Sequence, residues 1–376
     1  MYKINKNEVE KISSCPACFN KKIIKISEVF YKNNFPFFST SYCDKCTLIF
    51  RSKRPNEKWF LKKWNLRHNL QRSKSINFLN SKIEVDRRKR YELILDGIIQ
   101  KKQKILDIGC GPGTGLKKYT SNNIVHGIEP DITRAKIAKK NNIKVFNCSL
   151  KKFYKKQENR YDIIIFFHTL EHMFNPRETI KMIKNLLNKN GKLIIEVPNF
   201  LDWVGSWHDS LYLAHTQNFN LFSLNQIMTK IDFYPTEVFY TKYKGKEKNI
   251  CAIYKKDNSK KDTVKLFFKN LKRTLTYEKV KKIYNPENKK IMEININKIN
   301  DLSLTYKPTK KVHQNILDNI LERKIVFNKI IKKYEVHGKD LKLSKKLKIK
   351  KTNNYEKILD KECYKINRFL KKLDNE

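Results

Sequence analysis

Residues 105–115 read ILDIGCGPGTG, and this stretch decides the fold that we expect. Ile105 to Ile108 form a short apolar-rich strand that runs straight into a loop rich in glycine. Glycines between a strand end and a helix start let the backbone approach a ligand lying over the sheet edge. Glu129 ends the next predicted strand, at the distance from Gly109 where a carboxylate can hold both hydroxyls of a ribose. A nucleotide cofactor is indicated; an NAD site and a purely structural strand–helix turn stay open as alternatives.

The sequence around this loop alternates between strands and helices. Further strands are predicted at 124–128, 144–147, 162–167 and 192–197, and helices at 116–121, 132–140 and 177–188. Two more β-rich runs follow at 234–242 and 250–254. Regular alternation of this kind predicts a parallel sheet with helices on both faces.

Four segments in this region resemble the motifs of class I S-adenosylmethionine-dependent methyltransferases. They are 107–113 (DIGCGPG), 127–131 (GIEPD), 167–172 (FHTLEH) and 190–195 (NGKLII). The resemblance covers about residues 104–256 and implies a Rossmann-like α/β sheet of seven strands. The runs at 234–242 and 250–254 are then its sixth strand and its antiparallel seventh.

The same resemblance implies which residues bind S-adenosylmethionine. They are Asp107, Gly109, Gly111, Gly113, Glu129, Ser149, Leu150 and His168. The glycines and Asp107 are expected at the methionine moiety and Glu129 at the ribose. Ser149 and Leu150 are expected to border the adenine, and His168 to lie near the sulfonium.

Four cysteines near the start of the chain form two close pairs, Cys15 with Cys18 and Cys43 with Cys46. Each Cys-x-x-Cys knuckle presents two thiolates, so two knuckles at this spacing match a tetrahedral structural zinc site. This interpretation is favoured over a disulfide framework or a redox motif. Short strands are predicted at 23–29, 35–40 and 47–50, so we expect a zinc ribbon.

The chain has 376 residues and a formal charge of +45, from 82 Lys and Arg against 37 Asp and Glu. Such a charge favours an anionic partner, but charge totals describe solubility and non-specific attraction rather than a site. Only 13 of the basic residues are Arg, and residues 201–250, expected to line the substrate mouth, carry no net charge. Nucleic acid is therefore a possible partner but not the favoured one.

The zinc module joined to this core resembles zinc-containing methyltransferases that act on nucleotide-linked deoxysugars, with 43–50 (CDKCTLIF) as the matching knuckle. This implies methylation of a sugar or nucleotide-sugar in surface-polysaccharide or secondary metabolism, with His215 as the base. C- and O-methylation both stay open, because Ala214 stands where the family has a glutamate. A structural role for His215 is the alternative, beside a helix at 224–230 capped by Ser223.

Two other functions are weighed against this one. An rRNA or tRNA methyltransferase would use the zinc module and the basic surface. A non-catalytic methyltransferase-like scaffold would bind a partner instead, although the intact glycine loop argues for activity. We expect a small anionic sugar nucleotide as substrate.

The expected organisation has four parts: a zinc ribbon over 1–55, a helical cap over 56–103, the methyltransferase domain over 104–256 and a Lys-rich helical extension over 257–376. The longest apolar run, Ile163 to Phe167, is too short to span a bilayer. No signal-peptide pattern is seen at the start, so a cytoplasmic location is expected.

Overall fold

The computed structural model describes ten segments: 5–31, 35–61, 82–156, 159–200, 214–243, 247–256, 262–264, 294–295, 304–308 and 364–371. The chain forms two compact units. The first unit comprises residues 1–63, 200–223 and 273–356, and the second comprises 64–199, 224–272 and 357–376. Each contains one seven-stranded sheet.

The sheet of the second unit has the strand order β11-β12-β9-β8-β5-β6-β7. Its strands are β5 (Lys104–Ile108), β6 (Ile124–Ile128), β7 (Lys144–Phe146), β8 (Tyr161–Phe167), β9 (Leu187–Pro198), β11 (Tyr234–Tyr243) and β12 (Glu247–Lys255). The five strands β5 to β9 pair in parallel, whereas β12 is antiparallel to both of its neighbours. The predicted Rossmann-like sheet with an antiparallel seventh strand is confirmed.

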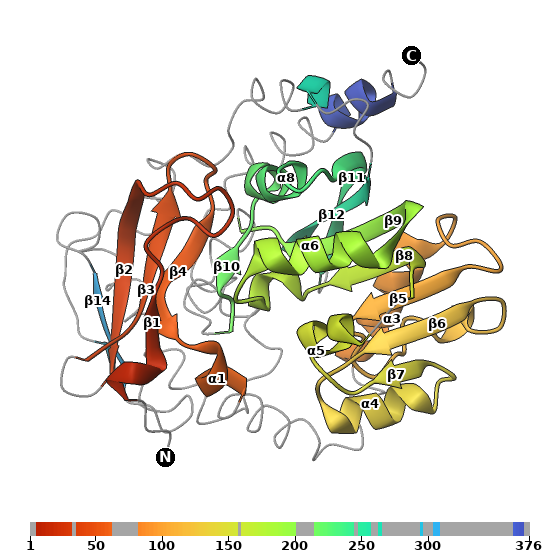
Figure 1. Ribbon diagram of the computed structural model, residues 1–376, viewed down its shortest axis with the longest axis horizontal. Helices are drawn as coiled ribbons and strands as arrows, with labels where there is room; N and C mark the ends of the chain where they lie inside the picture. Colours follow the sequence, from red (N-terminus) through yellow and green to blue (C-terminus); the bar gives the residue numbers. More distant parts are fainter. Residues whose placement is uncertain are drawn as a thin grey trace. The chain divides into compact units, whose positions relative to one another are not determined.

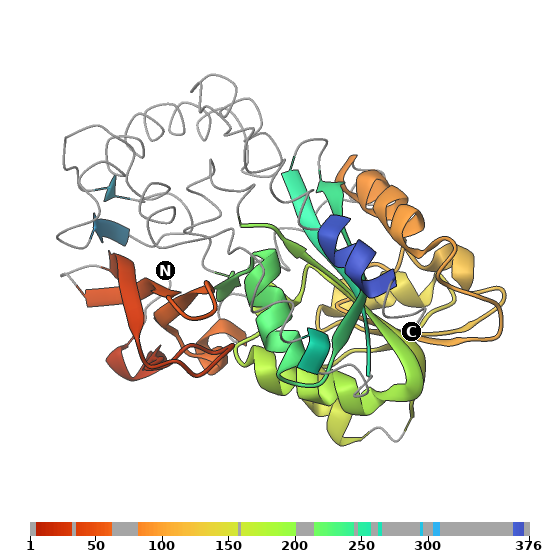
Figure 2. The same cartoon turned by 90° about the horizontal axis from the view of Figure 1, so that it is seen from above.

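The central strands are apolar along almost their whole length. In β8 every residue except Asp162 is buried, as expected for a parallel strand covered on both faces. The helices are α3 (Lys82–Leu95), α4 (Ile132–Lys139), α5 (Leu150–Lys155), α6 (Pro176–Leu186) and α8 (Leu221–Thr229). Figures 1 and 2 together show α6 and α3 on opposite faces of this sheet.

One predicted helix is shorter than expected. The segment 116–121 forms only a 3₁₀ turn, Lys117–Tyr119. Tight i to i−3 hydrogen bonds close this turn, including one from the Tyr119 N–H to the Leu116 carbonyl. A single turn of this type is typical of a short connector between a loop and a strand.

The outer edge of β11 is covered by the helical segment 364–371. The Asn367 side chain donates to the Val238 carbonyl at 2.7 Å and accepts from the Val238 N–H at 3.0 Å. Ile366 and Leu370 of the same segment are buried. An edge strand with unpaired backbone groups attracts other strands, so Asn367 protects this edge.

The sheet of the first unit has the order β1-β4-β3-β2-β14-β13, and β10 also pairs with β4. Its strands are β1 (Val9–Lys11), β2 (Ile23–Tyr31), β3 (Phe35–Cys43), β4 (Ile49–Pro55), β10 (Gln217–Asn218), β13 (Ile294–Asn295) and β14 (Leu304–Pro308). Before it lies η1 (Lys6–Glu8), and after β4 comes α1 (Glu57–Trp59). The strands predicted within the N-terminal module are present and longer than expected.

Two features of this unit differ from the expected organisation. Residues 200–223, expected within a continuous domain over 104–256, group with the N-terminal sheet because β10 pairs with β4. The tail expected to be helical contributes β13 and β14 to the same sheet. Most of the helical extension predicted over 257–376 lies outside the described residues. Within the described segments, no helix is both long and apolar enough to cross a membrane.

Candidate active site

The glycine loop follows β5 at the carboxyl end of the parallel strands. Hydrogen bonds from the Gly109 and Cys110 N–H groups to the Ile128 carbonyl, at 2.8 and 3.2 Å, hold the loop against the end of β6. Gly109 has φ +79°, and a Cβ there would lie 2.6 Å from Thr169 Oγ1. Only glycine fits this position without strain. The next elements lie on opposite sides of β5, so the loop occupies a topological switch point.

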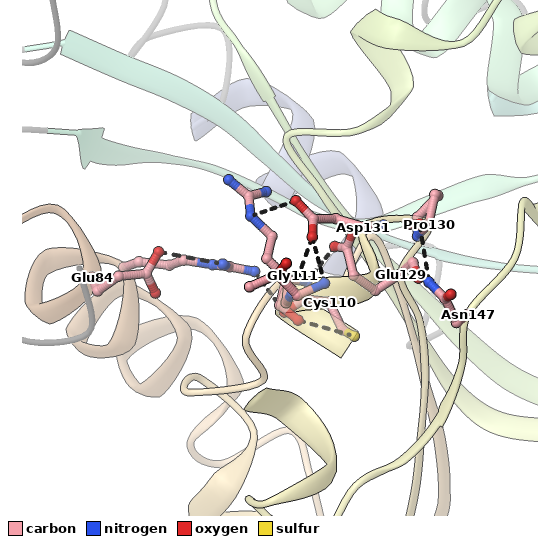
Figure 3. A network of polar contacts seen from close by, with 10 residues as sticks. Glu84, Cys110, Gly111, Glu129, Pro130, Asp131 and Asn147 are labelled. Atoms are coloured by element: carbon pink, nitrogen blue, oxygen red, sulfur yellow. Dashed lines mark hydrogen bonds and ion pairs between the residues drawn. The ribbon is translucent and has the colours of Figure 1, made fainter. Parts of the chain in front are cut away.

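Glu129 follows β6 and reaches back to this loop. One carboxylate oxygen accepts from the Gly111 N–H at 2.8 Å, and the other accepts from the Asp131 N–H at 2.9 Å. Figure 3 shows this arrangement, with Glu129 between Gly111 and Asp131. Burial raises the pKa of Glu129. Each carboxylate oxygen can accept more than one hydrogen bond, so the group can also receive hydroxyl donors.

Two neighbouring side chains fix the turn after Glu129. Asp131 accepts from the N–H groups of Thr133 and Arg134 and so caps the start of α4. Asn147, at the end of β7, donates to the carbonyls of Glu129 and Pro130 at 2.8 and 2.9 Å. Figure 3 shows the hydrogen bond from the Asn147 amide to the Pro130 carbonyl. The backbone that carries Glu129 is therefore held from both sides.

Asp107 lies under the loop, fully buried in β5. Its Oδ2 accepts from the Tyr91 hydroxyl at 3.2 Å, and its Oδ1 has no hydrogen-bond partner among the described residues. Burial raises the pKa of Asp107 to about 7, against the opposing effects of Arg87 and Tyr91. A buried carboxylate oxygen without a donor is costly, so this atom fits a cationic or hydrogen-donating ligand group.

Arg87, on α3, is a site residue that the sequence reasoning missed. Its Nη2 donates to the Cys110 carbonyl at 2.8 Å, and a Cβ on Gly111 would overlap its guanidinium. Gly111 has φ +57°. Glu84 and Tyr91 come from the same helix, with Glu84 Oε1 3.6 Å from Arg87 Nη1 and the guanidinium 5.5 Å from the Tyr91 ring centre. The spacing 84, 87, 91 is the helical period that would have placed them on one face.

A second polar network surrounds Glu196, which the sequence reasoning also missed. Glu196 lies near the end of β9, fully buried, and accepts from Arg90 Nε at 2.8 Å and Asn249 Nδ2 at 3.2 Å. The Thr241 hydroxyl also donates to it. Burial acts to raise the pKa of Glu196, but Arg90 and His168 outweigh it and lower the pKa to about 2. This carboxylate is ionised at neutral pH.

His168 follows β8, in the left-handed region at φ +48°. Its Nε2 lies 3.3 Å from Glu196 Oε2, and its Nδ1 lies 3.7 Å from Glu171 Oε1. The side chain of His168 is 23% exposed. The next residue, Thr169, donates to the Ile108 carbonyl at 3.3 Å. The structure therefore brings His168 to the same strand ends as the glycine loop.

For the other predicted cofactor residues the structure gives a role in the fold and no observation that points to a ligand. The Ser149 hydroxyl accepts from the Lys152 N–H and caps α5, and Leu150 is the buried first residue of that helix. Gly113 lies against Ala138 and Ile143, where a Cβ would be crowded. Their cofactor contacts stay predictions.

His215 belongs to the first unit, just before β10, and is buried. Its role as a base stays a prediction. The helix after it begins one turn earlier than expected. Asn220 accepts from the Ser223 N–H at 3.0 Å, while the Ser223 hydroxyl accepts from the Asn220 N–H at 3.0 Å. Asn220, not Ser223, therefore caps α8, because the pair forms a reciprocal capping arrangement.

The four paired cysteines converge in the first unit. Their sulfur atoms all lie within 4.8 Å of one another, and the four side chains are buried. Cys15 Sγ is 3.4 Å from Cys46 Sγ, and Cys18 Sγ is 3.5 Å from Cys43 Sγ. Disulfide sulfurs lie about 2.05 Å apart, so none of these contacts is a disulfide.

The two knuckles share one backbone pattern. In each, the first cysteine carbonyl accepts from the N–H four residues later, of Phe19 or Thr47, at 2.8 Å. Each first cysteine N–H then donates at 2.9 Å to a carbonyl five residues later, of Asn20 or Leu48. Phe19 and Thr47 both have positive φ, at 59° and 61°. Two matching turns that aim four thiols at one point fit a tetrahedral metal ion.

The strand order, the glycine loop at the switch point and the acidic residue after the second strand define a Rossmann-like methyltransferase fold. Residues 79–238 match the sequence family described as a methyltransferase domain. The enzyme class expected from the sequence is confirmed at the level of this domain.

Two curated relatives are similar to part of the chain. An uncharacterized methyltransferase of Schizosaccharomyces pombe is 27% identical over 145 residues, covering 34% of this chain and 52% of the relative. A ubiquinone biosynthesis O-methyltransferase of Glaesserella parasuis is 32% identical over 108 residues, covering 26% and 46%. The chain thus spans about half the length of the curated relatives it matches.

Solved structures of methyltransferases are also similar. The 1,6-didemethyltoxoflavin-N1-methyltransferase of Burkholderia thailandensis, solved with S-adenosylhomocysteine, is 13% identical with a TM-score of 0.45. The match covers 61% of this chain and 100% of that one. Magnesium protoporphyrin IX methyltransferase of Synechocystis is 15% identical with a TM-score of 0.40, covering 53% and 97%.

Proposed function

We propose that this protein transfers a methyl group from S-adenosylmethionine to a small polar acceptor. The observation that carries the proposal is the position of Glu129. Its carboxylate bridges the Gly111 and Asp131 N–H groups at the sheet edge, where a ribose lies in a Rossmann-like site. The methyltransferase-domain match over 79–238 supports the same activity.

The residues beside Glu129 fit the remaining groups of this cofactor. The donor-free Oδ1 of Asp107 would accept from the methionine ammonium, since it is buried and lacks a partner among the described residues. The guanidinium of Arg87, against Gly111, would hold the methionine carboxylate. Glu129 would take the ribose hydroxyls, and Leu150 would lie against the adenine. The cofactor supplies an electrophilic methyl group, which the chain must orient and shield from water.

Calorimetry with S-adenosylmethionine tests this assignment. We expect Glu129→Ala and Gly111→Val to weaken binding by a factor of 100 or more, because the first removes the ribose acceptor and the second forces a side chain into Arg87. Glu178→Gln changes an exposed carboxylate on α6 and serves as the matched control. Unchanged affinity in Glu129→Ala would overturn the cofactor assignment.

For the acceptor we propose a sugar or nucleotide-sugar, methylated on carbon or oxygen with the help of a histidine base, for which the sequence suggests His215. The support is the joint occurrence of the four-cysteine module and the methyltransferase domain in one chain. A labelled-methyl assay on a nucleotide-sugar panel, run beside total RNA, tests it. Transfer to RNA alone would replace this acceptor with rRNA or tRNA, and transfer to neither would favour a non-catalytic scaffold.

We also propose that the cysteine cluster holds one structural zinc ion and that the protein acts in the cytoplasm. All four positions around the cluster are thiols, which leaves no position for a catalytic water. Metal analysis of the purified protein should give one zinc per chain. Four reactive thiols and no zinc would contradict the assignment.

A further inference from the structure

A charged network lies beside the proposed cofactor site but is not explained by cofactor binding. Glu196 lies near the end of β9 with no exposed surface and is paired with Arg90. Burying a charged pair costs more desolvation energy than well-packed apolar residues would, so such a pair is weak evidence for stability alone. Among the described residues, His168 is a partner of Glu196 whose side chain reaches solvent.

The placement of His168 points to the reacting centre. It follows β8 directly, and its neighbour Thr169 packs on Gly109 of the cofactor loop. Its left-handed φ of +48° is uncommon for a residue with a side chain. The His168 N–H donates to the Glu196 carbonyl at 2.8 Å, and the ring Nε2 lies 3.3 Å from the Glu196 carboxylate, so one residue of β9 contacts both the backbone and the ring. Local strain that neighbouring contacts hold in place is a feature of functional sites.

We propose that His168, rather than His215, is the general base for methyl transfer and that Glu196 is the positioning residue that holds it. The inference rests on the proposed methyltransferase function. The ionised Glu196 lies beside Nε2 of His168 and keeps the proton on that nitrogen, so Nδ1 is the basic nitrogen of the neutral ring. Arg90, Thr241 and Asn249 fix the carboxylate from the other side.

In the proposed step, His168 accepts the proton that the methyl acceptor loses. A lone pair of the acceptor atom forms a bond to the methyl carbon of the sulfonium donor, the carbon–sulfur bond breaks and its electron pair stays on sulfur. The proton lost by the acceptor passes to Nδ1 of His168. The resulting imidazolium is stabilised by the carboxylate of Glu196 and returns the proton to solvent through its exposed part.

Charged or titratable groups of the described residues face His168 from three elements. They are Arg87 and Arg90 from α3, Glu171 from η5 (Leu170–His172) and Glu196 from β9. Burial and the two arginines lower the pKa of His168, whereas Glu196 raises it. Burial raises the pKa of Glu171 to about 8, so this carboxyl is neutral at pH 7. Glu196 is therefore the only one of the two carboxyl groups that is negative when the base works.

The first test is ring NMR on ¹⁵N-histidine-labelled full-length protein, with the His168 signals assigned by their loss in His168→Gln. We expect the Nε2–H tautomer in the wild type and a clear fall in the His168 pKa in Glu196→Gln. Glu171→Gln is the matched control and should shift it by less. An Nδ1–H tautomer, or an unchanged pKa in Glu196→Gln, overturns the inference.

The second test is kinetic, with whichever nucleotide-sugar supports turnover. General-base contributions of about 100-fold or more are typical, so His168→Gln should lower kcat by that factor. Glu196→Gln should lower kcat about 10-fold or more and move the acidic limb of the pH profile to lower pH, with KM within twofold. Glu196→Asp should restore part of the activity. Wild-type kcat in His168→Gln contradicts the inference.

Two measurements separate this inference from other failures. The single variant Glu196→Gln leaves the buried charge of Arg90 without a partner and is expected to lose stability. The double variant Arg90→Gln/Glu196→Gln has no unpaired buried charge, so it should keep the fold. Its pH profile should still be shifted. Calorimetric S-adenosylmethionine binding should persist in Glu196→Gln. If the wild-type protein does not bind S-adenosylmethionine, the proposed function itself is overturned.

Discussion

The two sheets of this protein obtain their stability from different sources. The sheet of the second unit buries continuous apolar strands, such as β8, under helices on both faces. In the N-terminal sheet the buried strand β4 carries Arg51, Ser52 and Arg54, and the unit places four thiols at one point. A small core of that kind depends on a metal for folding energy. The comparison predicts that one sheet fails by losing an ion and the other by losing packing.

The largest expected effect is the loss of the metal site. Cys43→Ser removes one of four converging thiols, and structural zinc contributes an apparent free energy of about 10 kcal/mol in small modules. We expect zinc content to fall below one per chain and amide exchange to become fast over 15–55, with 105–197 still protected. Cys148→Ser, outside the cluster, is the control. Simultaneous loss of protection in both sheets would contradict the claim that the two sheets have different sources of stability.

A packing defect should have the converse effect. Ile165→Ala removes a fully buried side chain of β8, and such truncations cost about 2–5 kcal/mol. We expect the denaturation midpoint of the second unit to fall while zinc content stays at one per chain. Ile124→Ala, at a position that is 60% exposed, should change the free energy of unfolding by less than about 0.5 kcal/mol. Zinc release from Ile165→Ala would contradict independent sources of stability.

The buried carboxyl of Asp107 gives the second unit a pH dependence of its own. Its pKa rises from 3.8 to about 7 on folding, so the folded state binds more protons between these values. The free protein should therefore lose stability as pH rises from about 4 to 7. Ionised Asp107 is the form that accepts an ammonium, so S-adenosylmethionine affinity should rise up to tenfold per pH unit below pH 7. Calorimetry from pH 4 to 7 should show the stability of the free protein falling and the S-adenosylmethionine affinity rising. In Asp107→Asn both quantities should depend less on pH.

The smallest effect is expected at the cap of α8. Asn220 accepts from Ser223 and also donates to Thr47, so Asn220→Ala removes a helix cap worth about 1 kcal/mol. Thermal unfolding followed by circular dichroism should show a small decrease in Tm, with zinc retained. Asn122→Ala, on an exposed turn, should leave Tm unchanged. An equal decrease in both variants would remove the role of the cap.

The sequence predicts the second sheet almost completely, because its signals are local. The glycine loop and Glu129 lie within one strand–helix–strand unit, and short-range spacing is enough to bring them together. The two cysteine knuckles are equally readable. Arg87 and Glu196 could not be found in this way, since their meaning depends on which strand ends and helix faces meet. Their partners, Cys110 and His168, belong to other elements of the chain.

The organisation of the first sheet was beyond local patterns for a stronger reason. β10 is a very short strand, and its pairing with β4 joins positions near 50 to positions near 217. No period can be read from such a short strand. The strand β4 ends at Pro55, whereas residues from 200–223 and 273–356 also belong to the first unit.

The split edge of β4 has a consequence for how this module can be moved between proteins. One stretch of that edge, 53–55, pairs with β1, and the next, 49–50, pairs with β10. A fragment that ends at residue 55 would keep its zinc ligands but expose the unpaired amides of 49–50. Such an edge promotes association between copies. The four-cysteine module therefore cannot be moved to another protein as residues 1–55 alone. A transferred module must include residues 214–220, which contain the strand that pairs with 49–50.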